Sequence, residues 1–193
     1  MKKTLLALGA ALALSGCSLF GAKPPPTLMT LKSAQERPPG ATGTAADGET
    51  ITVVPPQVAR ELETVRVPVH QSDIAVAYLK NAQWVEVPSN LFARLVSETI
   101  AATTGRVVLD SRQFTLDPGT RLTGTLQRFG LDATRMEVVA TYDAALARRG
   151  GGVTTRRFEA RVPVAVADAA NVSPALNQAA NEVATQVAAW VGR

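Results

Sequence analysis

The chain has 193 residues, of which 46% are hydrophobic, 19% charged and 5% aromatic, enough for one domain with a substantial core. Lys and Arg total 20 against 16 Asp and Glu, but they do not cluster into a basic face, so we expect no nucleic-acid partner. A single Cys and a single His exclude a disulfide framework and the usual multi-ligand metal sites, and they disfavour acid–base catalysis. We therefore expect no catalytic residue, no metal and no cofactor.

The first seventeen residues have the features of a secretion signal followed by a lipid-attachment site. Lys2 and Lys3 precede residues 4–13, an apolar run too short to span a bilayer as a permanent helix. The next four residues resemble the lipobox of bacterial lipoproteins: Leu14, Ser15, Gly16 and Cys17. We predict that residues 1–16 are removed as a signal peptide and that Cys17 is lipidated.

The predicted anchor consists of acyl chains on Cys17. The thiol would accept a diacylglyceryl group, and the amine freed by cleavage would accept a further chain. Each buried CH₂ contributes about 0.8 kcal/mol, so two or three chains together hold the protein stably in a membrane. Ser18 follows the Cys, whereas an Asp at that position tends to retain Gram-negative lipoproteins in the inner membrane. By this analogy we expect the protein on the periplasmic face of the outer membrane.

Residues 17–50 are predicted to comprise the lipidated Cys and a semi-extended tether. They contain Pro at 24–26 and 38–39 and several Gly, with too little apolar surface to offset the entropy of ordering. Residues 28–31 are an exception, because this short strand-like segment is expected to dock on the edge of the domain. The folded domain is predicted to span residues 51–193.

The domain opens with predicted strands and one helix. Strands are expected at residues 51–54, 65–69, 74–79, 84–87, 106–109, 121–129, 136–146 and 153–164. Pro68 predicts an edge position or a bulge in its strand, and residues 148–152 predict a hairpin loop. The first helix is expected after the fourth strand, with Ser89 or Asn90 as its N-cap and Gly105 at its end.

The last helix has the clearest pattern. Ser173 is its expected N-cap, Pro174 its first helical residue and Gly192 its end. One face carries the apolar residues Leu176, Ala180, Val183, Val187, Trp190 and Val191. The opposite face is polar but nearly uncharged, and consists of Asn177, Gln178, Asn181, Glu182, Thr185 and Gln186. This polar face is either chance in an Ala-rich segment or a surface that meets a partner.

These elements predict an α+β fold. We expect a single domain in which a mostly antiparallel sheet carries two main helices packed on one face. The two long strands on either side of residues 148–152 favour antiparallel pairing. The order of the strands is left open by the sequence.

The sequence disfavours a catalytic triad and a calcium site. His70 is followed closely by Ser72 and Asp73, but catalytic triads are assembled from separate segments of a fold, so His70 is interpreted as a surface residue at a strand end. Asp110 and Asp117 flank a loop, but a calcium site needs more oxygen ligands at closer spacing. Both are interpreted as turn residues.

Four arginines surround the predicted hairpin loop: Arg148, Arg149, Arg156 and Arg157. One interpretation is a solvated loop and strand. The other is a contact with anionic lipid headgroups or with an acidic patch on a partner. These residues are the candidate contact site of the domain.

The chain as a whole resembles the ABC-type transport auxiliary lipoprotein family, the PqiC-like partners of MCE-domain lipid transporters. The resemblance includes the lipobox and the Pro-rich tether. Within the domain it rests on a strand ending in Val54, Pro55 and Pro56, on Arg66, Val67, Tyr78 and Trp84, on the helix residues Leu91, Phe92 and Leu95, on residues 106–108, and on Ala175, Leu176 and Asn177.

The resemblance implies a non-enzymatic role in lipid transport between the two membranes. The partner would be a periplasmic MCE-domain protein and, through it, an inner-membrane ABC permease and ATPase. The lipoprotein would dock the MCE protein at the outer membrane, and a ring-shaped partner would favour a homo-oligomer. Two other functions share the same anchor and tether: regulation of a cell-wall synthase, and plugging of an envelope-assembly β-barrel.

Overall fold

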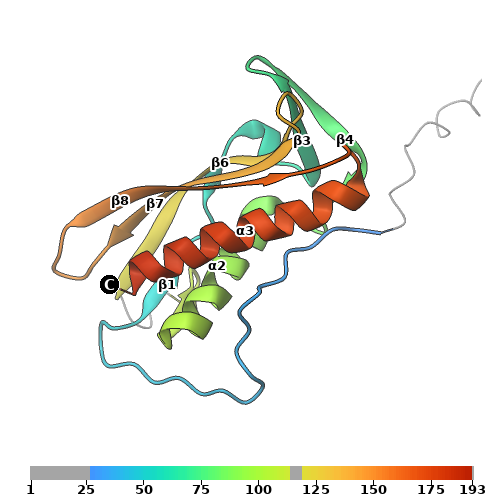
Figure 1. Cartoon of the computed structure of the whole chain (residues 1–193). Helices are drawn as coiled ribbons and strands as arrows, with labels where there is room; N and C mark the ends of the chain where they lie inside the picture. Colours follow the sequence, from blue (N-terminus) through green and yellow to red (C-terminus); the bar gives the residue numbers. More distant parts are fainter. Residues whose placement is uncertain (1–26, 114–118, 193) are drawn as a thin grey trace, which may run out of the picture.

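The computed structural model describes residues 27–113 and 119–192, which form an α+β fold with one mixed sheet and two long helices. Figure 1 shows both helices on the same face of the sheet. The elements in chain order are β1 (Ile51–Val53), β2 (Gln57–Val58), the 3-10 helix η1 (Arg60–Leu62), β3 (Arg66–Ser72), β4 (Ala75–Gln83), α2 (Pro88–Thr104), β5 (Val108–Asp110), β6 (Thr120–Asp132), β7 (Glu137–Ala147), β8 (Val153–Pro163) and α3 (Ala169–Val191).

The longest strand, β6, lies at the centre of the sheet. On one side it pairs antiparallel with β7 over almost its whole length, and β8 continues the ladder antiparallel to β7. On the other side, β1, β2 and β3 pair parallel to successive stretches of β6. Beyond them, β4 pairs antiparallel with β3 and β5 pairs parallel with β1. The α+β prediction is confirmed, with antiparallel long ladders and parallel short ones.

The first hairpin differs in detail from the prediction. The register between β3 and β4 shifts between Arg66 and Pro68, which confirms the predicted bulge, although β3 lies between β4 and β6 rather than at an edge. β4 begins at Ala75, so Ile74 lies in the turn instead of the strand. The strand predicted at 84–87 is wrong, because only Trp84 pairs there, as an isolated bridge to Met29.

The first predicted helix has the expected end but a different start. Gly105 adopts a φ of 69°, the left-handed conformation that ends α2, as predicted. The predicted caps Ser89 and Asn90 are wrong, because the N-cap position is Val87, without a side-chain cap, and Pro88 begins the helix. Pro suits that position because its fixed φ is already helical and its missing N–H has no partner there.

The last helix starts earlier than the sequence predicted. Asp168 is the N-cap, and its Oδ1 accepts a hydrogen bond from the backbone N–H of Asn171 at 2.9 Å. Ser173 and Pro174 therefore lie inside α3, so the predicted start is wrong by about one turn. Asp168 and Ser173 are both good N-cap residues, and the structure uses Asp168, which satisfies the N–H of Asn171. The helix ends at Gly192, as predicted.

The apolar face of α3 packs on β7, β8 and α2. Of the predicted core-facing residues, Leu176, Ala180, Val183, Val187 and Val191 are buried, whereas Trp190 is half-buried and contacts Phe158 at 5.6 Å between ring centroids. Further buried alanines on α3 let it lie close to its neighbours, because a short side chain permits a close helix approach: Ala175, Ala179, Ala184 and Ala188.

An aromatic cluster joins the layers at the centre of the core. Phe129 on β6 stacks on Trp84, with ring centroids 5.5 Å apart, and meets the edge of Phe92 of α2 at 6.4 Å. Phe92 also contacts Tyr142 of β7, at 5.1 Å between centroids. Such pairs add about 0.5–1.5 kcal/mol each beyond the burial of their area. The cluster therefore fixes α2 and the end of β4 against the central strands.

The N-terminal segment docks on the domain, as predicted for residues 28–31. Met29 donates its backbone N–H to the Gln83 carbonyl at 2.7 Å, and its carbonyl accepts from Val85 N–H at 2.9 Å. The contact continues beyond residue 31, and we call residues 29–34 the strap. Lys32 N–H donates to Asn177 Oδ1 at 2.8 Å.

The Asn181 side chain forms two hydrogen bonds with the backbone of the strap. Its Oδ1 accepts from Ala34 N–H at 2.7 Å, while its Nδ2 donates to the Lys32 carbonyl at 2.9 Å. Ser33 is buried and its hydroxyl lies 3.2 Å from that of Thr99 on α2. Part of the polar face of α3 therefore binds the strap, a segment of the same chain (Figure 1).

Gly124 of β6 lies where the neighbouring chain leaves no room for a side chain. Tyr142 lies across it, and an added Cβ would come 2.7 Å from the ring and collide with the Asp143 carbonyl. We expect Gly124→Ala to lower the free energy of unfolding by about 1–3 kcal/mol through overpacking. Urea denaturation followed by circular dichroism measures this. Gly152→Ala is the control, because nothing lies within 4 Å of its added Cβ; equal stability of the two variants would contradict the prediction.

The hydrogen bonds between Asn181 and the strap can be tested by substitution. Asn181→Ala removes both bonds to the strap, so we expect the amide protons of residues 32–34 to exchange faster with solvent, and stability to fall by about 1 kcal/mol. Hydrogen exchange read by mass spectrometry tests this. Gln178→Ala is the matched control, since within the described part of the chain the Gln178 side chain bonds only to Glu182 on the same helix. Unchanged exchange in Asn181→Ala would contradict the assignment.

Candidate functional site

The structure describes the domain but not the residues of the predicted anchor. Leu14, Ser15, Gly16 and Cys17 lie outside the described residues. The described chain begins beside the end of β4, where Met29 forms its bridge to Trp84. None of the helices among residues 27–113 and 119–192 is long and apolar enough to cross a membrane.

The four candidate arginines lie around the β7–β8 hairpin loop, as predicted. Arg148 and Arg149 are exposed in the turn itself, which is closed by a 3.0 Å bond from Gly151 N–H to the Arg148 carbonyl. Gly150 takes a φ of 67°, as the turn requires. Among the described residues, neither arginine has an ion-pair partner.

Arg156 and Arg157 point to opposite faces of the sheet, because successive side chains alternate along a strand. Arg157 donates two hydrogen bonds to Asp143, at 2.6 and 2.7 Å, and this pairing holds the pKa of the Asp143 carboxyl below its usual range. Arg156 lies on the helix side, where its guanidinium carbon is 5.1 Å from the centre of the Phe158 ring. The structure therefore does not bring the four arginines into one patch.

The face of the sheet opposite the helices is charged but internally paired. Arg161 on β8 donates to Glu159 at 2.7 Å and to Glu137 on β7 at 2.5 Å. Thr141 donates its hydroxyl to the other oxygen of Glu159 at 2.8 Å. Since cross-strand partners neutralise each other here, the unpaired positive charge of the hairpin is left at its loop, on Arg148 and Arg149, and on Arg156.

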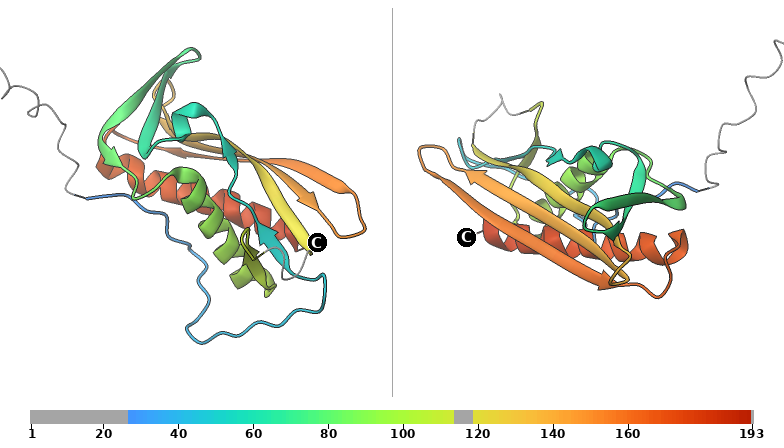
Figure 2. Two further views of the ribbon diagram at one scale, coloured as in Figure 1. Left: turned by 180° about the vertical axis from the view of Figure 1, so that it is seen from behind. Right: turned by 90° about the horizontal axis from the view of Figure 1, so that it is seen from above.

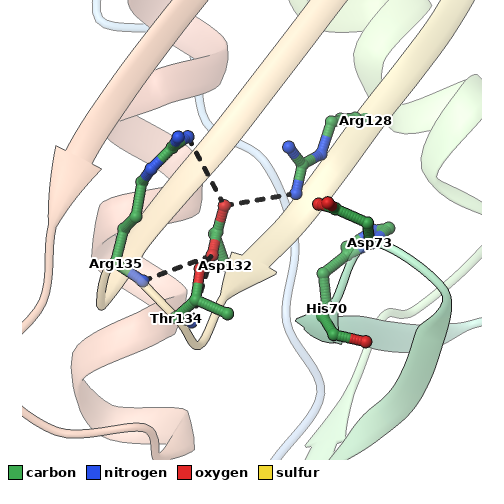
Figure 3. Close-up of a pocket in the computed structure, with 7 residues that line it drawn as sticks. His70, Asp73, Arg128, Asp132, Thr134 and Arg135 are labelled. Carbon is green, nitrogen blue, oxygen red and sulfur yellow. Dashed lines mark hydrogen bonds and ion pairs between the residues drawn. The ribbon is translucent and has the colours of Figure 1, made fainter.

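A polar cavity of about 320 Å³ lies at the other end of the β6–β7 ladder (Figure 3). It is lined by residues from the end of β3, the end of β6 and the β6–β7 turn: His70, Ser72, Asp73, Arg128, Asp132, Thr134 and Arg135. A backbone bond of 2.9 Å from Ala133 N–H to the His70 carbonyl ties the turn to β3. Sequence reasoning singled out the first three residues only, because the others come from a segment far away in the chain.

Asp132 is the best-connected residue of this cavity. Its Oδ1 accepts from the Thr134 hydroxyl at 2.6 Å and from the backbone N–H groups of Thr134 and Arg135, and its Oδ2 lies 3.5 Å from Arg128. The Thr134 hydroxyl is the largest of the causes that keep the pKa of the Asp132 carboxyl below its usual range, against the opposing effect of burial. Asp132 thus acts as the acceptor that organises the turn.

The cavity gathers His70, Ser72 and Asp73, but they are not connected as a triad. His70 Nε2 lies 3.1 Å from the Glu61 carboxylate. The Ser72 hydroxyl oxygen accepts from Ile74 N–H at 3.4 Å. A triad needs the hydroxyl paired with the imidazole, and here the imidazole meets a carboxylate instead.

Of the two aspartates that flank the loop after β5, the structure describes Asp110 only. Asp110 Oδ1 accepts from the backbone N–H groups of Arg112 and Gln113, at 2.8 and 3.2 Å, so Asp110 is a turn residue as predicted. Asp117 lies outside the described residues. Within residues 27–113 and 119–192, no group of three His, Cys, Asp or Glu side chains is placed to hold a metal ion.

Asp132 generates a prediction about pH. Because its pKa is lowered in the folded protein, its stabilising contribution is present at neutral pH and is lost as the pH falls below about 4. We expect Asp132→Ala to cost about 1–3 kcal/mol at pH 7 and progressively less as the pH falls below 4, because wild type then loses the same contribution. Urea unfolding across pH measures the difference. Asp73→Ala is the control, and a pH-independent cost of Asp132→Ala would contradict the prediction.

Two family models match the chain. The family model described as ABC-type transport auxiliary lipoprotein component matches residues 30–188, and the model of the prokaryotic membrane lipoprotein lipid attachment site matches residues 1–18. No curated protein matches the chain.

Two solved structures share the fold. The crystal structure of protein XCC0632 from Xanthomonas campestris is 19% identical, with a TM-score of 0.71 over 86% of this chain and 94% of that one. A second crystal structure, of an uncharacterized protein, is 16% identical, with a TM-score of 0.58 over 77% and 93%. The sequence match spans most of the chain, from within the strap to within α3, and shows that the chain belongs to the ABC-type transport auxiliary lipoprotein family.

Proposed function

We propose that this protein is a non-enzymatic outer-membrane lipoprotein that docks the periplasmic MCE-domain component of an ABC-type lipid transport system. The family match over residues 30–188 supports an auxiliary role in transport, and the lipid attachment site over residues 1–18 supports a membrane anchor. Acyl chains on Cys17 would hold the protein at the periplasmic face of the outer membrane. The MCE protein would connect it to the inner-membrane permease and ATPase.

The position of the arginine loop relative to the anchored end carries this proposal. Met29 and Trp84 lie by Phe129, near the end of β6, whereas the β7–β8 loop lies at the start of β6. Phe129 pairs with Ala140, and β7 continues for seven more residues to Ala147 at the loop, about 23 Å further along the ladder. Figure 2 shows the beginning of the described chain and the hairpin at opposite ends of the molecule. The hairpin is therefore presented away from the point where the anchor enters.

We assign the docking contact to the three unpaired arginines of this hairpin: Arg148, Arg149 and Arg156. Exposed guanidinium groups pair readily with carboxylates, and a local excess of positive charge speeds association with an acidic surface. An acidic patch on the MCE protein is accordingly the expected partner surface. Arg157, neutralised by Asp143, contributes little to this contact. A ring-shaped partner would bind several copies of the lipoprotein, which makes self-association part of the proposal.

Crosslinking in the native envelope tests the proposal. The full chain with Cys17 intact and a C-terminal tag is expected to bring down an MCE-domain protein after mild crosslinking. Recovery of a cell-wall synthase or of an outer-membrane β-barrel, without an MCE protein, would overturn the transport function in favour of one of the two alternative functions.

Substitutions at the hairpin test the contact itself. The triple variant R148S/R149S/R156S is expected to reduce recovery of the MCE protein several-fold because it removes the unpaired charge. The matched control is Arg157→Ser, which changes an arginine of the same hairpin that is already paired. Equal recovery of the MCE protein with both variants would show that it binds elsewhere on the domain.

A further inference from the structure

The β3–β4 hairpin ends in an apolar tip that the core does not use. Ile74 is 97% exposed and Val76 is 44% exposed. Two aliphatic side chains in solvent are unremarkable by themselves. Here, however, Ile74 follows directly after Asp73, which lines the polar cavity. An apolar tip and a charged cavity are therefore neighbours on one hairpin.

The cavity presents both signs of charge. Arg128 and Arg135 flank the Asp132 carboxylate at 3.5 and 4.0 Å, so two guanidinium groups share one carboxylate. Asp73 supplies a second carboxylate, which has no ion-pair partner among the described residues; in Figure 3 it lies on the side of the cavity that faces Arg128. These two cations and two anions leave the cavity close to neutral. A zwitterion fits such a cavity better than a simple anion or cation, because each of its charges then meets an opposite one.

The hairpin tip also lies within reach of the lipid anchor. Residues 17–26 can span at most about 33–36 Å when fully extended. The nine residues of β4 place the tip about 30 Å from Gln83, where the strap is bound. The reach of residues 17–26 exceeds this distance, so the membrane that holds the anchor can meet the hairpin tip.

We propose that the β3–β4 hairpin tip and the polar cavity behind it form a contact site for the zwitterionic phospholipids of the membrane that anchors the protein. Arg128 and Arg135 bind the headgroup phosphate, and Asp73 binds the ammonium. Ile74 enters the apolar boundary below the headgroups. The contact orients the domain on the bilayer, and it requires the lipid anchor but not a transport partner.

A single-thiol label tests the insertion of the tip. The chain has one Cys, and its lipidation leaves an introduced Cys as the only free thiol. The lipidated full chain carrying Ile74→Cys is labelled with an environment-sensitive fluorophore and placed in phosphatidylethanolamine–phosphatidylglycerol vesicles with nitroxide-bearing acyl chains. The matched control is Val153→Cys, an exposed β-branched residue on the arginine hairpin, 65% exposed. We expect several-fold stronger quenching at position 74, and equal quenching at both positions would overturn the membrane contact.

Headgroup recognition is tested in the same vesicles. Asp73→Asn and Arg135→Gln, each in the Ile74→Cys background, are expected to reduce quenching several-fold without changing the thermal midpoint, because neither side chain is part of the core. Replacing phosphatidylethanolamine by phosphatidylglycerol is expected to reduce quenching in the parent protein but not further in Asp73→Asn. Quenching that is indifferent to both headgroup and substitution would overturn the role of the cavity. No partner protein is present, so these outcomes do not depend on the crosslinking experiment.

Discussion

The hydrogen-bonded ladder of β6 holds the rest of the fold in place. On one side β6 pairs with a single long strand, while on the other it is shared by three short strands, none of which could form a stable sheet alone. The first hairpin, the β1–β5 pair and the polar cavity are all positioned through this one strand. Gly124 shows how tightly the pairing is packed, since there is no room for even one methyl group between β6 and Tyr142.

The strap extends this order to the chain that leads to the anchor. Asn177 and Asn181 offer amide groups at the spacing of one helical turn, and these satisfy the backbone of an extended segment in the way a neighbouring strand would. The domain is thus connected to its anchor at residues 29–34, close to the end of β6, rather than at residue 51 where the sheet begins. This shortens the free length of the tether and restricts how the domain can be oriented relative to the membrane.

Local patterns in the sequence predicted the parts of the fold that depend on local physics. The β7–β8 hairpin, the left-handed Gly105 and the apolar stripe of α3 follow from turn chemistry and periodicity. The start of α3 was missed because Asp168 competes with the equally plausible Ser173–Pro174 signal, and only tertiary packing decides between them. The cavity was missed because Asp73 and Arg135 meet only once β3 pairs with β6, and no local pattern reveals that pairing.

The distribution of charge along β6 and β7 would let one small domain serve the two proposed contact surfaces. In the middle of the ladder, cross-strand pairs such as Asp143–Arg157 and Glu137–Arg161 cancel each other and leave no net field. At the cavity end, Arg128 and Arg135 share Asp132, while Asp73 has no ion-pair partner among the described residues. At the other end, Arg148 and Arg149 leave positive charge at the hairpin loop. About 36 Å separates these ends, several times the screening length at physiological salt, so a membrane bound at one does not perturb electrostatically a partner bound at the other. A rigid ladder of this kind can hold a periplasmic partner at a fixed distance from the bilayer.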